Sequence, residues 1–486
     1  MKTKRSFGFE ALVLTASKVI TLIISLANVM LLARFRTVEE YGTYSEILLV
    51  ISLATTIFML GVPNSINFFL PRAESNDGKR HFLSVYYTAS TILSVITGIL
   101  LVLISPAVVK YFHNESIRAF LYFFAIYPWI NVVGASIDNV LIVYEKTAWL
   151  LVYRLVYSIV MILDVVAIKL LCLGFSEYMM LLIITSALLT LAVYYLASSL
   201  CGGIYFTLDK KLFREILLFS LPLGLASIVG TLNAEIDKLL IGYLMNSEQV
   251  AIYMNAAKEL PITVIPSSIS AILMPQIALL VKKNKIDTAV ELWKNATELS
   301  FIFISVVVCG VFTFANEAVT FLYSEKYIAG VPVFRVYVLN LLFRVTYFSM
   351  FLSAYGHTKK IFICSIVSLL TNAVMNPLMY ACFGMIGPAI ATLGAIVVVM
   401  VLQLRMTSKI TDHRIRDLFP WKNTFNNLLI NIGFSIVFFF ISNILPLERV
   451  IGNVAEAMIL GIIWILCYFA FVQNNAKMLW DKLKGE

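Results

Sequence analysis

Charged residues are scarce in this chain. They make up 13% of its 486 residues, whereas hydrophobic residues make up 60%. A soluble domain carries about 25% charged residues, because its surface faces water. The scarcity of charge therefore excludes a water-soluble protein and indicates a membrane protein. It also excludes a soluble basic face for nucleic acid, although the formal net charge is +9.

Metal-binding and disulfide-forming patterns are lacking as well. The 4 histidines and 6 cysteines are scattered, with no CxxC pair and no cysteine near a histidine at ligand spacing. We therefore expect no metal and no other cofactor. The alternating ten-residue pattern of an outer-membrane barrel is also absent, so we expect the apolar stretches to be helices.

Long apolar runs are what the chain has instead. Each is long enough to cross a hydrocarbon core of about 30 Å as a helix. The runs fall at residues 9–32, 44–70, 82–109, 119–143, 148–174, 178–206, 215–243, 250–281, 298–322, 328–354, 361–382, 384–404, 425–446 and 453–473. They predict an all-α polytopic membrane protein of about fourteen transmembrane helices, in which the first run is retained because no small-residue cleavage site follows it.

The basic residues of the loops indicate the orientation of the chain. With both termini in the cytoplasm, 23 lysines and arginines fall in the cytoplasmic loops and tails and 7 fall on the opposite side. Basic loops are enriched on the cytoplasmic side of membrane proteins. We therefore expect both termini to be cytoplasmic.

Three short patterns recur in the same order, 203 to 211 residues apart. They are residues 31–44 with 240–253, PNSI at 63–66 with PSSI at 266–269, and YEKT at 144–147 with YGHT at 355–358. They predict a six-helix lobe at residues 1–206, a second six-helix lobe at 207–410, and two additional helices with a cytoplasmic tail at 411–486. Because six is even, the two lobes form a parallel repeat, and we expect them to face each other across a central cleft.

Several ionisable residues fall inside the apolar runs, where a charge costs a few kcal/mol. Lys18 and Arg344 lie far from the ends of their predicted helices, so we interpret them as lining a cavity. Tyr337, Asn340 and Tyr347 recur with Arg344 along one predicted helix. Basic groups in such a cavity suit a phosphate or pyrophosphate. Tyrosine and asparagine suit the hydroxyls of a sugar.

The acidic residues in the runs have two readings. Asp164 requires a proton, a cation or a basic neighbour at its depth. Glu235 and Asp237 lie beside Lys238. These three residues form either a self-neutralising network or a site that binds a coupling ion. We keep Asp164, Glu235 and Asp237 as candidates for coupling to a proton or a sodium ion.

Nearly the whole chain resembles one family of transporters. The resemblance is carried by LGVPNSI at residues 60–66, DKLLIG at 237–242 and GMIGPAIAT at 384–392. In these stretches the chain is similar to the polysaccharide-exporter and O-antigen flippase branch of the multidrug/oligosaccharidyl-lipid/polysaccharide exporter superfamily. The resemblance implies two lobes around a V-shaped cleft and alternating access in the bacterial inner membrane, and it implies no enzymatic activity.

The resemblance also implies a substrate and a basic cavity that binds it. The substrate would be a polyprenyl-pyrophosphate-linked oligosaccharide, with its lipid tail left among the membrane lipids. The candidate lining is Lys18, Arg72, Arg154, Arg335, Tyr337, Asn340, Arg344 and Tyr347. We expect a monomer that works alongside polysaccharide assembly enzymes. A drug–cation antiporter and a lipid II flippase are alternatives with the same architecture, and a membrane glycan polymerase or glycosyltransferase is an alternative of another class.

Overall fold

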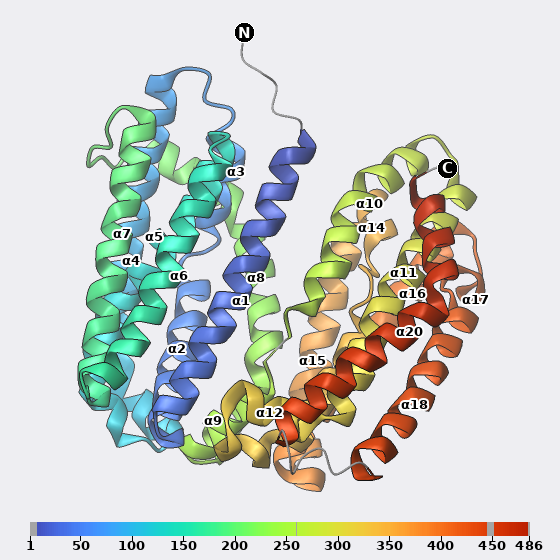
Figure 1. The fold of residues 1–486 in the computed structure, drawn as a ribbon. Coiled ribbons are helices and arrows are strands. Elements are labelled where there is room, and N and C mark those ends of the chain that lie inside the picture. Colours follow the sequence, from blue (N-terminus) through green and yellow to red (C-terminus); the bar gives the residue numbers. More distant parts are fainter. Residues whose placement is uncertain (1–6, 259, 445–451, 485–486) are drawn as a thin grey trace. The chain divides into compact units, whose positions relative to one another are not determined.

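The computed structural model describes residues 7–258, 260–444 and 452–484, with side chains from residue 20 to residue 483. This part of the chain consists of helices and loops and contains no strand (Figure 1). Its contacts divide it into an N-terminal unit that ends at Ala251 and a C-terminal unit that begins at Ile252.

Nine α-helices begin in the described part of the N-terminal unit. They are α1 (Phe7–Phe35), α2 (Val38–Phe58), α3 (Ile66–Phe69), α4 (Asn76–Phe112), α5 (Leu121–Val143), α6 (Thr147–Leu170), α7 (Phe175–Cys201), α8 (Lys210–Leu244) and α9 (Ser247–Ala256). The helices of the C-terminal unit are α10 (Val264–Lys282), α11 (Ile286–Thr313), α12 (Ala315–Tyr323), α13 (Val331–Asn340), α14 (Met350–Ala354), α15 (Thr358–Phe383), α16 (Gly387–Thr411), α17 (Ile415–Leu418), α18 (Trp421–Ile444) and α20 (Asn453–Lys484).

Most of these helices are apolar enough to cross a membrane. Within the described residues, 12 stretches have the length and hydropathy of a membrane span. One of them, Thr358–Thr411, contains two helices, α15 and α16, which pack along each other. The described apolar part of α1, Ile20–Phe35, is shorter. The prediction of an all-α membrane protein with about fourteen spans is confirmed.

The YEKT and YGHT motifs end their helices in the same way. In each motif the third residue donates its N–H to a carbonyl five residues earlier, Lys146 to Leu141 and His357 to Leu352, at 2.8 Å in both cases. The residue before each donor has a left-handed backbone, with φ of 55° and 73°. This is the hydrogen-bond pattern of a Schellman cap. The same turn, 211 residues apart, supports a duplication.

The helix starts repeat at a nearly constant interval. The N-terminal unit has a long helix, the 3-10 helix η2 (Glu115–Phe120) and then α5; the C-terminal unit has α11 and α12, the 3-10 helix η4 (Glu325–Gly330) and then α13. The starts of α4 and α11 are 210 residues apart, and so are those of α5 and α13. These intervals support two copies of one helix pattern. The lobe boundaries at residues 206 and 410 stay predictions.

Close glycine contacts pack α8 against the N-terminal unit. Gly61 has a left-handed φ of 77°. It lies against Gly224, where an added Cβ would be 2.4 Å from the carbonyl carbon of Leu60. Further along α8, Tyr111 Oη donates to the Leu239 carbonyl at 3.0 Å. The contacts therefore group α8 with the N-terminal unit, although the predicted lobe boundary precedes it.

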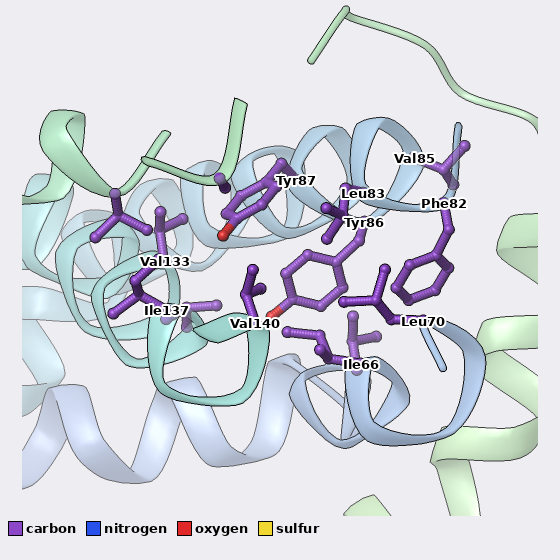
Figure 2. Close-up of a cluster of buried hydrophobic side chains, with 14 of the residues drawn as sticks. Ile66, Leu70, Phe82, Leu83, Val85, Tyr86, Tyr87, Val133, Ile137 and Val140 are labelled. Carbon is purple, nitrogen blue, oxygen red and sulfur yellow. The ribbon is translucent and has the colours of Figure 1, made fainter. Parts of the chain in front are cut away.

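The main core of the N-terminal unit lies among α3, α4 and α5 (Figure 2). Tyr86 and Tyr87 of α4 are almost completely buried there, and Tyr87 Oη lies 3.0 Å from Ser136 Oγ. The apolar side chains around them include Ile66, Leu70, Phe82, Val133, Ile137 and Val140, and α6, α7 and α8 also contribute to the core. These positions of α5 therefore serve packing.

The prediction of one continuous helix at residues 328–354 is wrong. α13 ends at Asn340 and is followed by the 3-10 helix η5 (Leu341–Phe343). Residues 344–349 are not helical, and α14 begins at Met350. Trp293 of α11 donates its indole N–H to Thr346 Oγ1 at 2.9 Å, and Phe348 packs edge-to-face on the Trp293 ring. These contacts hold the non-helical segment in place.

Candidate functional site

Five of the predicted cavity residues lie on the interrupted helix of the C-terminal unit. Arg335, Tyr337 and Asn340 are on α13, and Arg344 and Tyr347 lie in the non-helical segment that follows. Arg344 is exposed, and so is Tyr347 at 43%. The prediction that Arg344 lies within a continuous helix is therefore wrong, because the helix ends before it.

Two polar groups on α13 are buried and have no hydrogen-bond partner among the described residues. One is Nε of Arg335, whose guanidinium lies 5.6 Å from the centre of the Phe312 ring. The other is Oδ1 of Asn340, a residue that is 3% exposed. Leaving such a group unsatisfied costs about 1–3 kcal/mol. A polar ligand that reached them would satisfy both groups.

Arg154 is bound to an acidic residue of the neighbouring helix. Its guanidinium on α6 donates two hydrogen bonds to the Asp138 carboxylate on α5. The two side chains are 19% and 35% exposed. Asp138 thus matches the charge of Arg154, and the pair joins α5 to α6.

Asp164 lies on the same helix as Arg154 and is 5% exposed. Its carboxylate accepts a hydrogen bond of 2.6 Å from the Thr185 hydroxyl of α7. The hydroxyl is a neutral partner, so it does not offset a negative charge on Asp164.

The charged cluster late in α8 has an internal ion pair. Lys238 Nζ donates to Glu235 Oε2 at 2.6 Å, one helical turn away. Asp237 is 1% exposed. The ion pair between Glu235 and Lys238 agrees with the interpretation of this cluster as a self-neutralising network.

The remaining two candidates lie near the start of the chain. Arg72 is exposed in the turn after α3, with its guanidinium 3.3 Å from the centre of the Phe68 ring. Phe68 stacks on Phe219 of α8 at 4.1 Å. Lys18 belongs to α1, but its side chain lies outside the described residues.

Sequence reasoning missed three buried glutamates, Glu46, Glu298 and Glu456, which is 3% exposed in α20. Glu46 of α2 is completely buried and accepts a hydrogen bond of 2.7 Å from Asn114. Glu298 of α11 is 4% exposed and accepts hydrogen bonds from Asn423 and Asn475. Each lies in or at the edge of a predicted span, so acidic residues in apolar runs were the available signal.

A model of the family described as polysaccharide biosynthesis protein matches residues 31–332. The chain belongs to this family. The matched residues include helices α2 to α12. They therefore extend from the N-terminal unit into the first helices of the C-terminal unit. No curated protein matches the chain in sequence.

Solved structures share the fold of this family member. A lipid II flippase MurJ in an inward closed conformation has a TM-score of 0.74 at 17% identity, over 95% of this chain and 99% of that one. An inward-facing multidrug resistance MATE transporter of the MOP superfamily has a TM-score of 0.66 at 14% identity, over 83% and 99%. A MOP superfamily transporter from Pyrococcus furiosus has a TM-score of 0.52 at 14% identity, over 83% and 94%. The chain therefore shares the fold of these transporters.

Proposed function

We propose that the chain is a flippase that moves a polyprenyl-pyrophosphate-linked oligosaccharide across the bacterial inner membrane by alternating access. Its substrate would be a repeat unit of a surface polysaccharide or an O-antigen. The interrupted helix from α13 to α14 carries the proposal. It combines arginines suited to pyrophosphate with an amide and phenols suited to sugar hydroxyls.

The break in this helix supports a binding role. Non-helical backbone within a membrane is stable only where protein covers it or where it lines a water-filled cavity. Arg344 and Tyr347 are exposed at the break. In transporters, interrupted helices often form the substrate site. Substrate contacts with Arg335 Nε and Asn340 Oδ1 would also satisfy the two buried groups that have no partner.

The other cavity candidates take secondary roles in this proposal. Lys18 and Arg72 would add positive charge along the path of the pyrophosphate. Arg154 is the weaker candidate, because the Asp138 carboxylate already matches its charge. Both termini would be cytoplasmic, and the protein would act as a monomer beside polysaccharide assembly enzymes.

We further propose a proton or a sodium ion as the coupling ion, with Asp164 as its first candidate. Asp164 is buried against a neutral hydroxyl, so binding a cation would neutralise it. Glu235 is offset by Lys238. Asp237, which is 1% exposed, is the second candidate in α8. Among the described residues, no group of three acidic, cysteine or histidine side chains could hold a metal ion.

The experiment that tests the function uses a deletion strain. Newly made surface glycan is labelled, and the lipid-linked intermediate is extracted from each face of the inner membrane. We expect the intermediate to accumulate on the cytoplasmic face, surface glycan to be lost, and this gene to restore it. Normal surface glycan in the deletion strain would overturn the proposal.

Two further outcomes would identify the rival transporters. Accumulation of peptidoglycan precursor in place of the glycan intermediate would indicate a lipid II flippase. Normal glycan with a changed sensitivity to cationic compounds would indicate a drug–cation antiporter. The polysaccharide biosynthesis family of the chain favours the glycan substrate over both.

A further inference from the structure

A completely buried carboxyl group lies in the N-terminal unit, on a different helix from Asp164. It belongs to Glu46 of α2, which is 0% exposed. Glu46 lies about 12 Å along the helix axis from Val38, the first residue of α2. In the proposed orientation this end of α2 is at the outer side of the membrane, so a proton would reach Glu46 from there.

The polar groups next to this carboxyl are neutral. Asn114, in the loop after α4, donates its amide to Glu46 Oε2 at 2.7 Å and to Thr43 Oγ1 at 2.9 Å. Ser247 of α9 is a further neutral neighbour. Glu46 Oε1 has no hydrogen-bond partner among the described residues. A negative charge on Glu46 would therefore be offset only in part.

No cation balances Glu46 in the described part of the chain. No lysine, arginine or histidine nitrogen there lies within 4.0 Å of its carboxyl oxygens. Nearby, Arg36 donates to two backbone carbonyls between α6 and α7, and Arg118 is paired with Glu115. Because an ionised carboxylate without a partner is costly to bury, Glu46 needs a proton in this structure. The titratable and charged groups on the elements around it are Arg34, Arg36, Glu39, Glu40, Tyr41, Tyr44, Lys110, Tyr111, His113, Glu115, Arg118, Tyr122, Tyr127, Glu235, Asp237, Lys238, Tyr243 and Glu248.

α2 touches the start of α9 one helical turn before Glu46. An added Cβ at Gly42 would be 1.9 Å from the carbonyl oxygen of Ser247, so only glycine fits there. Gly42 and Glu46 are four residues apart and therefore lie on the same face of α2. The carboxyl thus faces the contact with α9, the helix in which the N-terminal unit ends at Ala251.

The second copy of the proposed repeat has a neutral residue at this position. Tyr44 corresponds to Tyr253, 209 residues later, so Glu46 corresponds to Asn255. Asn255 is 1% exposed. A buried amide in one copy therefore stands where a buried carboxyl stands in the other, and the position accepts a polar side chain without a charge.

We propose that Glu46 binds a proton and that release of this proton separates the start of α9 from α2. With its proton the carboxyl is neutral, like the amide of Asn255. Without it, the charge gains water when the contact at Gly42 opens, while Asn114 can donate to the carboxyl in either form. The proton therefore holds the first turn of α9 on the N-terminal unit.

The test measures the opening of α9 in the purified full chain, without any transport step. The chain is placed in lipid nanodiscs, and hydrogen–deuterium exchange is followed by mass spectrometry from about pH 6 to about pH 8, with the exchange times corrected for the pH dependence of the chemical step. We expect exchange at the start of α9 to rise by up to about tenfold for each pH unit, because opening releases one proton.

Three variants decide whether Glu46 is the group that loses the proton. Glu46→Gln is neutral at every pH, so its exchange should stay at the low-pH level, and Glu46→Asn, which carries the side chain of Asn255, should behave in the same way. Glu248→Gln removes an exposed glutamate of α9 and should keep the pH dependence of the unmodified chain. Exchange that does not change with pH in the unmodified chain, or that rises equally in Glu46→Gln, would contradict the proposal. No outcome depends on flipping, so this proposal and the proposed function fail separately.

Discussion

α5 and the interrupted helix from α13 to α14 hold the same place in the two copies of the repeat that we propose, yet only the second is interrupted. α5 runs without a break from Leu121 to Val143, although Pro128 lies inside it. Its counterpart ends at Asn340 and resumes at Met350. Both copies then finish with the same Schellman turn. In the proposed repeat, the break is therefore confined to the second copy.

Two polar residues of the second copy, Asn340 and Arg344, correspond to buried apolar residues of the first. Counting 210 residues back from α13 and 211 from the final turn pairs Arg335 with Ala125, Asn340 with Ile130, Arg344 with Val133, and Tyr347 with Ser136. Ile130 and Val133 are buried in the N-terminal unit. One copy of this helix thus supports the fold, and the other carries the groups that we assign to the substrate.

Replacing the arginines of the interrupted helix should have the largest effect. In Arg344→Ala or Arg335→Ala, we expect export to fall about tenfold or more, because a charge-assisted contact to phosphate is lost. Labelled surface glycan, measured at equal amounts of inserted protein, checks this. Arg344→Lys should restore export only in part, since lysine does not form the bidentate contact.

Arg118→Ala is the matched control for these variants. Arg118 is exposed and paired with Glu115 in η2, which corresponds to η4 in the second copy. An exposed pair of this kind contributes little to stability. Full export by inserted Arg344→Ala and Arg335→Ala variants would contradict their assignment to the substrate.

Replacing Asn340 by an apolar residue, as in the first copy, should change the stability of the protein and its export activity in different ways. Asn340→Leu replaces the asparagine by a residue like its counterpart, Ile130. Because Oδ1 of Asn340 has no partner, we expect unchanged or higher stability, by up to about 1 kcal/mol, together with several-fold lower export. Thermal unfolding of the purified protein and labelled glycan measure the two effects.

The reverse exchange controls for the effect of polarity itself. Ile130→Asn places an amide in the packed core of the first copy, where Ile130 is 4% exposed. We expect a loss of about 2–3 kcal/mol of stability. If Asn340→Leu lowered stability as much as Ile130→Asn does, Asn340 would be a structural residue.

Hydropathy and recurring motifs predicted the spans and the repeat, but the break in helix ten could not be read from them. Residues 341–349 contain no glycine and no proline, so the apolar run looks continuous. The break depends on contacts with a distant helix, such as the hydrogen bond from Trp293 to Thr346. Arg154 and Asp138 were both recognised, but their pairing depends on how α5 packs on α6. Neither the break nor the ion pair can therefore be predicted from the sequence without knowing which helices contact each other.

Breaking the ion pair between Asp138 of α5 and Arg154 of α6 should lower the stability of the protein moderately. Asp138→Asn leaves Arg154 without its charge partner, and we expect a loss of about 1 kcal/mol, since both side chains are partly exposed. Asp138→Asn/Arg154→Gln should recover most of that loss in thermal unfolding. Retained export by this double variant would make Arg154 structural, whereas lost export at normal stability would return it to the substrate site.

The smallest effect on thermal stability is expected at the contact between α4 and the start of α8. Asp209 caps α8, accepting hydrogen bonds from the N–H groups of Lys211 and Leu212. His81 of α4 donates to the same carboxylate at 3.2 Å. The hydrogen bond from His81, followed by those from the two N–H groups, lowers the pKa of Asp209 below its usual range.

A carboxyl group whose pKa is lowered by folding stabilises the protein at a pH above the ordinary pKa of that group. This stabilisation is lost as the pH falls through the lowered pKa. Between about pH 5 and pH 3, the unfolding temperature of the unmodified chain should therefore fall slightly more than that of Asp209→Asn. His81→Gln should reduce this difference, and equal acid sensitivity of the unmodified chain and Asp209→Asn would show that the link from α4 to α8 does not depend on the Asp209 charge.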